Sequence, residues 1–148
     1  MTAISKALDL AMRAHAGQVD KAGQPYINHV LRVALAQTDP LRTVVALLHD
    51  VVEDTDVTLN DIVASFGHDV ADAVFAITKK GGERYGDYIQ RVRTNIVARD
   101  VKIADVLDNS GPARLAVLPE AVQKRLRRKY EETYHALVTN SPAAPTGS

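Results

Sequence analysis

The segment HDVVEDT, residues 49–55, places four ionisable side chains directly after an apolar run. These side chains are His49, Asp50, Glu53 and Asp54. Residues four positions apart share a helix face, so the histidine and the acids could point toward one side of a helix. Carboxylates gathered beside a core are costly unless hydrogen bonds or a cation compensate them. A divalent metal would compensate them, and adjacent His49 and Asp50 could ligate it together.

Two neighbouring residues are too few for a metal site, so further ligands are expected elsewhere. His29 lies on the apolar face of a predicted helix, and Asp105 lies in VKIADVLDN among Ile103, Ala104 and Leu107. The chain has no cysteine, which excludes disulfides and thiolate ligands. Histidine and carboxylate donors together suit Mn, Fe, Zn or a similar ion.

Each of these residues has an ordinary interpretation. A single histidine on an apolar helix, such as His29, is more often a hydrogen-bonded core residue. Glu53 and Asp54 taken alone are typical of a solvated helix end, and Asp105 of a cap or an ion-pair partner. Spacing alone leaves the metal site and these interpretations evenly matched.

The elements that must position these side chains are predicted to be helices throughout. Asp39 and Pro40 form an N-cap with proline at the first helical position, and this helix is expected to continue to Glu53 or Asp54. Thr58 and Asp61 suggest a capping box. The other expected helices cover 3–15, a segment from Tyr26 onward, one after Thr58 that ends at Gly67, 69–79, 86–109 with an interruption near 99–100, and 119–138. The predicted fold class is all-α, a single helical bundle over 1–139 with a disordered C-terminal tail at 140–148.

Composition limits the class of protein. Eighteen basic residues balance eighteen acidic ones in 148 residues, which argues against a broad nucleic-acid-binding face. No apolar run approaches the roughly 20 residues of a membrane span, and the N-terminus lacks signal-peptide features. A cytoplasmic location without membrane or nucleic-acid partners is therefore expected, and the oligomeric state stays open.

Three segments carry a family likeness. They are AHAGQVDKAGQPYINHVLRVA, LLHDVVEDTDVTLNDIVASFGHDVADAVFAITK and VKIADVLDN. The His-Asp doublet with a distant His before it and a distant Asp after it resembles the HD metal-dependent phosphohydrolase superfamily. The order and spacing of the segments over residues 3–109 resemble the hydrolase domain of RelA/SpoT-type enzymes, whose stand-alone members are small alarmone hydrolases.

The resemblance implies a function and a set of roles. That family uses Mn²⁺ to hydrolyse the 3′-pyrophosphate of (p)ppGpp, and releases pyrophosphate with GDP or GTP; other divalent ions stay open here. The implied metal ligands are His29, His49, Asp50 and Asp105. Glu53 and Asp54 are implied to position and activate the attacking water, which agrees with carboxylate general-base chemistry.

Candidate contacts to the nucleotide follow from the same resemblance and from the placement of cations. Lys21 matches the family pattern best, and Asn109 matches the asparagine that contacts the nucleoside. Further candidates are Tyr26, Lys79, Lys80 and Arg84. The basic segment KRLRRK, residues 124–129, is interpreted as a solvated helix face, with a phosphate-facing Arg as the alternative.

The chain departs from the family pattern where the base and ribose would bind. Asp20 stands in place of an Arg that stacks on guanine, and Ala22 in place of a Ser. Asp108 replaces a His or Tyr, Pro112 replaces a Thr, and Val30 replaces a Pro. Reversing a charge and removing a planar group put guanine selectivity in question.

Three hypotheses remain open. The first is hydrolysis of (p)ppGpp. The second is the same chemistry on another nucleotide, such as ppApp, or removal of a single phosphate from an NADPH-like dinucleotide. The third is a metal-bound sensor that binds a nucleotide without turning it over, against which the presence of Glu53 and Asp54 counts.

Overall fold

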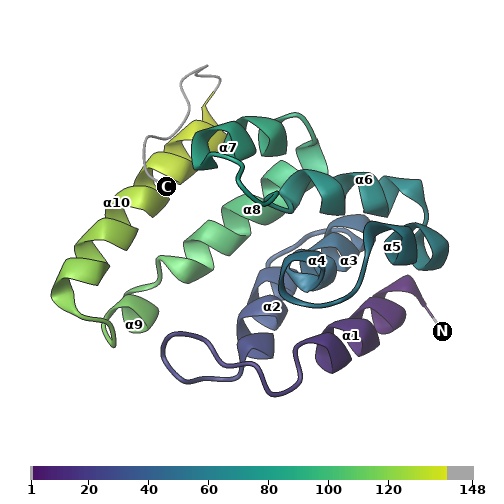
Figure 1. Cartoon of the computed structure of the whole chain (residues 1–148), viewed down its shortest axis with the longest axis horizontal. Helices are drawn as coiled ribbons and strands as arrows, with labels where there is room; N and C mark the ends of the chain where they lie inside the picture. The colour runs from purple at the N-terminus through teal and green to yellow at the C-terminus, as the bar shows by residue number, and fades with distance from the viewer. Residues whose placement is uncertain (1, 140–148) are drawn as a thin grey trace.

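The computed structural model describes residues 2–139, and they form an all-α bundle, as predicted (Figure 1). The predicted tail at 140–148 lies outside the described residues. Within 2–139 no strand is formed, apart from an isolated bridge between Val19 and Pro25. The helices are α1 Ala3–Ala14, α2 Tyr26–Leu35, α3 Pro40–Leu48, α4 Val51–Asp54, α5 Leu59–Phe66, α6 His68–Ile77, α7 Tyr85–Arg93, α8 Ile96–Asn109, α9 Pro112–Leu115 and α10 Glu120–Val138.

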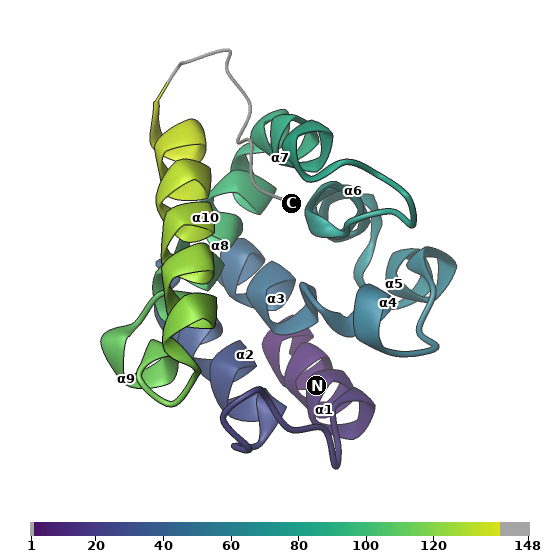
Figure 2. The ribbon, with the colours of Figure 1, turned by 60° about the vertical axis from the view of Figure 1, so that its left-hand side comes forward.

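Helix α3 is the centre of the bundle, and α1, α2, α6 and α8 pack around it (Figure 2). Its five consecutive residues 44–48 are all buried. A helix that is apolar on every side is stable only when it is covered on every side. The run VVALL therefore places the following residues, His49 and Asp50, at the end of the innermost helix.

The predicted helix starts at Asp39 and Thr58 are confirmed. The Asp39 side chain accepts from the backbone N–H of Arg42, with Pro40 in the first turn. Thr58 and Asp61 form the reciprocal capping box, and the helix that they open ends at Gly67 with φ of 87°. These local signals need only a few neighbouring residues, which is why they are readable from sequence.

Three helix boundaries differ from prediction. The helix expected to continue to Glu53 or Asp54 ends at Leu48, and a short α4 follows. The interruption expected near residues 99–100 lies instead before Asn95, whose side chain accepts from the backbone N–H of Ala98 and begins α8. The short α9 after Gly111 was not predicted. In each case a side-chain cap or a turn set by tertiary packing outweighs continuous helical periodicity.

None of the helices within 2–139 is both long and apolar enough to span a bilayer.

Candidate metal centre and active-site cleft

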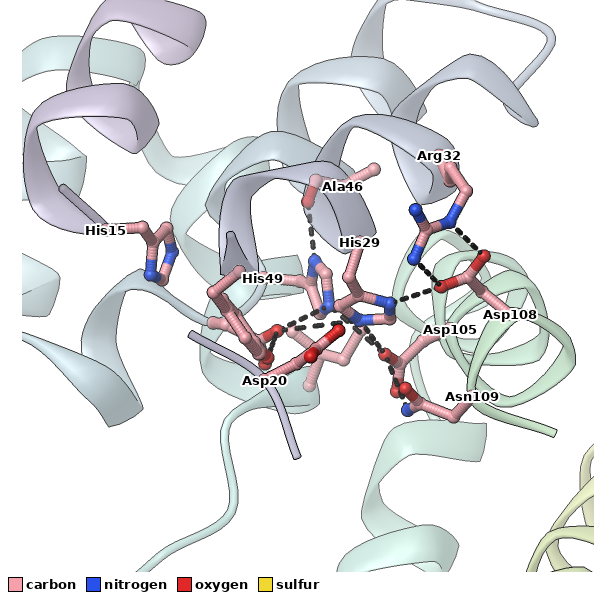
Figure 3. Close-up of polar contacts among 12 residues, drawn as sticks. His15, Asp20, His29, Arg32, Ala46, His49, Asp105, Asp108 and Asn109 are labelled. Atoms are coloured by element: carbon pink, nitrogen blue, oxygen red, sulfur yellow. Dashed lines mark hydrogen bonds and ion pairs between the residues drawn. The ribbon is translucent and has the colours of Figure 1, made fainter. Parts of the chain in front are cut away.

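Four side chains from three parts of the chain meet at the core end of α3. His29 comes from α2, His49 and Asp50 from the junction of α3 and α4, and Asp105 from α8. One ligand atom of each lies within 4.8 Å of all the others. His29 Nε2 is 2.8 Å from Asp105 Oδ1, and His49 Nε2 is 2.9 Å from Asp50 Oδ2. Two imidazole nitrogens and two carboxylate oxygens thus converge on one point, a donor set that fits a divalent metal. Figure 3 shows His29, His49 and Asp105 directed toward one another.

The break between α3 and α4 brings His49 and Asp50 to this point. His49 caps α3, and Asp50 precedes α4 with φ of −108° and ψ of −1°. A continuous helix would place successive side chains about 100° apart, whereas the break lets both turn inward. The Tyr26 hydroxyl donates to Asp50 Oδ2 at 2.5 Å and holds that carboxylate in place.

The second nitrogen of each histidine has its own partner. His49 Nδ1 lies 2.5 Å from the carbonyl oxygen of Ala46, and His29 Nδ1 lies 2.6 Å from Asp108 Oδ2 (Figure 3). Both partners accept a hydrogen bond, so each Nδ1 carries the proton and each Nε2 presents a lone pair to the cluster. These partners orient both rings for metal binding.

Lys102 keeps the buried Asp105 ionised. Its Nζ lies 2.9 Å from Asp105 Oδ2, which leaves Oδ1 directed at the two histidines. Burial alone would raise the pKa of Asp105, but Lys102, followed by His29 and His49, holds it well below the usual range. Sequence analysis missed Lys102; its i, i+3 spacing to Asp105 was the available signal.

A cleft of about 1050 Å³ opens from the cluster. Asp50, Glu53, Asp54 and Asp105 line it, and so do cations from several helices and loops. Partial burial, and then the charge of Asp50, raises the pKa of both Glu53 and Asp54. The lining cations are Lys21, Lys79, Arg84, Lys102 and Lys129.

Most of the predicted nucleotide contacts line this cleft. Lys21, Tyr26, Lys79, Arg84 and Asn109 are among its lining residues. Lys80 is not, because its Nζ lies 4.8 Å from the centre of the Phe75 ring on the outside of α6.

The last helix contributes a cation to the cleft that was expected to be solvated. Lys129 of α10 is half-buried, and its Nζ lies 4.4 Å from the centre of the Tyr85 ring. Burial, and then the nearby charge of Lys102, lowers the pKa of Lys129. The helix turns this one position of the 124–129 segment toward the cleft, an orientation that depends on how α10 packs on α7 and α8.

The loop before α2 is tied to α4 through a residue that sequence analysis left unassigned. The Gln18 Nε2 atom donates to the backbone carbonyl of Asp54 at 3.2 Å. Its Oε1 accepts from Nδ1 of the buried His15 at 2.8 Å. The loop thus holds the end of α4 through Gln18, and the first residue of the following α2, Tyr26, holds Asp50.

Comparison with known proteins agrees with this geometry. The family model described as HD domain matches residues 7–141. The chain belongs to the HD domain family. The family expected from the His-Asp doublet is therefore confirmed.

Curated relatives of this HD domain are longer proteins. It is 35% identical over 146 residues to a guanosine-3′,5′-bis(diphosphate) 3′-pyrophosphohydrolase of Aquifex aeolicus, covering 90% of this chain and 21% of the relative. It is 36% identical over 143 residues to a probable GTP pyrophosphokinase of Mycobacterium leprae, covering 87% of this chain and 18% of the relative. The chain thus spans about a fifth of the length of these relatives.

A solved structure matches the HD domain over nearly its whole length. It is described as a metazoan ortholog of SpoT that hydrolyzes ppGpp and plays a role in starvation responses. The TM-score is 0.74 at 28% identity, and the match covers 99% of this chain and 89% of the other. The arrangement of helices around the cluster is therefore shared with a protein of similar size.

Proposed function

We propose that this HD domain hydrolyses the 3′-pyrophosphate of guanosine alarmones, converting (p)ppGpp to GDP or GTP and pyrophosphate, with Mn²⁺ as the metal. The observation that carries the proposal is a buried two-histidine, two-carboxylate cluster at the floor of a cleft with acids on one side and cations around it. The names of the relatives and of the matching structure supply the substrate class.

The metal would be held by His29, His49, Asp50 and Asp105. Bound there, a divalent ion neutralises charge on a phosphoryl oxygen and lowers the pKa of a water molecule. The protein contributes the orientation of that site through Ala46, Asp108, Tyr26 and Lys102, each of which fixes one ligand.

Glu53 and Asp54 are assigned to the attacking water. They lie at the rim of the cluster, on the turn of helix that follows Asp50. Their raised pKa values make them stronger bases than ordinary carboxylates, so a carboxylate oxygen there can orient a water and accept its proton. Because both acids are exposed to the cleft, the proton can pass on to solvent.

The cations complete the site. Lys21, Lys79 and Lys129 line the cleft, and their ammonium groups form no salt bridge with a carboxylate of residues 2–139. A substrate that carries two pyrophosphate groups brings the negative charge that such a set of ammonium groups would offset. Lys102 is committed to Asp105 and is assigned to the metal site instead.

The test is product analysis with Mn²⁺-loaded protein and ppGpp, ppApp or NADPH in separate reactions. We expect pyrophosphate from ppGpp. Glu53→Gln should bind metal normally and lose about 10²- to 10⁴-fold in turnover, the range for loss of a general base. Release of single phosphate from NADPH, or turnover of ppApp without turnover of ppGpp, would mean that the substrate is that other nucleotide. Nucleotide binding at full metal occupancy without any product would replace the enzyme assignment with a sensor.

A further inference from the structure

A second, smaller pocket opens beside the cleft, with a volume of about 260 Å³. It shares Lys21, Tyr26 and Asn109 with the cleft. Tyr26 and Asn109 each also bond a carboxylate of the metal cluster, Asp50 and Asp105 respectively. One ligand could therefore place a phosphate end at the cluster and another end in this side pocket.

Apolar side chains form the far wall of the side pocket. They come from the end of α9, the segment after it and α10, and include Leu115, Leu118, Leu126 and Tyr130. Such a wall beside a highly charged cleft favours the one part of a phosphorylated nucleotide that is flat and uncharged, the base.

Besides the residues that it shares with the cleft, the side pocket has two charged groups, Asp20 and Arg114, joined by an ion pair of 3.3 Å. Asp20 Oδ1 also accepts the backbone N–H groups of Ala22 and Gln24, both at 2.9 Å. Both oxygens of the Asp20 carboxylate therefore have hydrogen-bond partners, one in its own loop and one on the arginine. Two departures from the family pattern, Asp20 and Asp108, become the two anchors of Arg114.

Arg114 retains donors after these bonds. Nη1 donates to Asp108 Oδ2 at 3.0 Å and to Asn109 Oδ1 at 2.7 Å. Nη1 also lies 3.0 Å from His29 Nδ1, but both of these nitrogens are donors to Asp108 Oδ2, so this contact is not a hydrogen bond. With Nη2 bonded once to Asp20, one N–H on Nε and one on Nη2 have no partner among the described residues. These two nitrogens form one edge of the planar group.

An edge with two donors matches a base edge with two adjacent acceptors. Guanine presents O6 and N7 in that arrangement, whereas adenine presents an amino donor beside N7. We propose, resting on the proposed function, that the side pocket takes the guanine base and that Arg114, fixed by Asp20 and Asp108, selects guanine over adenine.

The test compares binding of GDP, ADP and inorganic pyrophosphate to Mn²⁺-saturated protein by calorimetry. GDP should bind about 5- to 100-fold more tightly than ADP, the discrimination of one bidentate arginine–guanine pair. Arg114→Gln should bring GDP to the affinity of ADP and change pyrophosphate binding no more than the matched control variant does. Asp20→Asn should reduce the GDP preference in part, because the arginine loses one anchor.

Arg32→Gln is the matched control. Arg32 bonds the same Asp108 carboxylate, at 2.7 and 3.2 Å, but lies outside the side pocket. It should affect the neighbourhood of His29 as Arg114→Gln does, yet keep the GDP-to-ADP ratio of the wild type. An equal ratio in the two variants, or a wild type without GDP preference, would overturn the role of Arg114. Absence of ppGpp hydrolysis with the preference intact would count against the proposed function alone.

Discussion

At the scale of single residues, the site depends on partners that hold the proposed ligands. His29 illustrates this, since it lies between Asp105 at 2.8 Å and Asp108 at 2.6 Å (Figure 3). Asp108 is itself held by Arg32 and Arg114. A histidine in this setting has one ring nitrogen fixed as a donor, so the other is ready to bind a metal.

Replacing Asp108 tests this arrangement. Asp108→Ala should weaken Mn²⁺ binding about 10- to 100-fold, because the His29 ring loses the acceptor that sets its tautomer and orientation. Metal titration of the purified variant measures the change. Asp100→Ala is the control, since Asp100 is also an acid of α8 that pairs with an arginine, Arg42 of α3, but lies away from the cluster. Equal metal affinity in the two variants would contradict the role of Asp108.

At the scale of elements, the loop that precedes α2 acts as a brace for the cleft. It supplies Lys21, leads into Tyr26 at the start of α2, and through Gln18 holds the carbonyl end of α4. Helix α4 has only one turn, so its own hydrogen bonds cannot fix the direction of Glu53 and Asp54. Contacts from outside the helix must do so.

Gln18→Ala should affect turnover and metal binding differently. We expect kcat to fall about tenfold while metal affinity stays unchanged, because the two acids lose their position relative to the cluster and the ligands do not. Steady-state kinetics together with metal titration distinguish these effects. Gln24→Ala, in the same loop, removes an exposed side chain and should behave as wild type. A parallel fall in metal affinity would instead assign Gln18 to the metal site.

A second connection between elements joins α6 to α7. Arg91 donates to the carbonyl oxygens of Phe75 and Thr78 at 2.6 Å, and pairs with Glu83 at 2.9 Å. The Arg91 hydrogen bond is the main favourable cause that lowers the pKa of Glu83 from 4.5 to about 2. The arginine thereby satisfies the last carbonyls of α6 and shapes the loop that carries Lys79 into the cleft.

This ion pair predicts a pH dependence of stability. A carboxyl whose pKa is lowered on folding stabilises the protein above its unfolded pKa, and loses that contribution as pH falls toward its folded pKa. Glu83→Gln should lower the free energy of unfolding by about 1–2 kcal/mol at pH 7, discounted for solvent screening. The difference from wild type should stay constant down to about pH 5 and shrink from pH 4.5 toward pH 2. Urea unfolding over this range measures it, and a difference independent of pH would contradict the ion pair.

At the scale of the whole molecule, the cluster joins three helices that are distant in sequence. His29 of α2 and Asp105 of α8 lie 76 positions apart, and both meet the end of the central α3. A metal bound by all three would bind the folded state only, and its binding free energy would add to stability.

Metal should therefore raise the melting temperature. At a free Mn²⁺ concentration 100 times the Kd, the expected gain is about 2.7 kcal/mol. That gain corresponds to roughly 5–10 °C for a domain of this size. Thermal unfolding with added Mn²⁺ or with chelator measures the shift, and Asp105→Asn should abolish it. A wild type that melts at the same temperature in both conditions would contradict a metal site at this cluster.

Features that depend only on neighbouring residues could be read from the amino-acid sequence. The all-α class, the caps at Asp39 and Thr58, and the end of a helix at Gly67 follow from local propensity and hydrogen bonding. The candidate ligands were also visible, because ionisable side chains stand out in segments that otherwise have the composition of a core. Their roles in chemistry remain predictions.

The partners of these side chains became known from the folded structure. Three features depend on contacts between segments up to 94 positions apart. They are the ends of α3 and α7, the position of Lys129 in the cleft, and the pairing of Asp20 with Arg114. Local pattern carries no information on such contacts, since either partner alone is an ordinary surface charge. Asp20 appeared from sequence to be the loss of a cation at the base pocket. In the folded chain it is the residue that holds another cation, Arg114, in the side pocket.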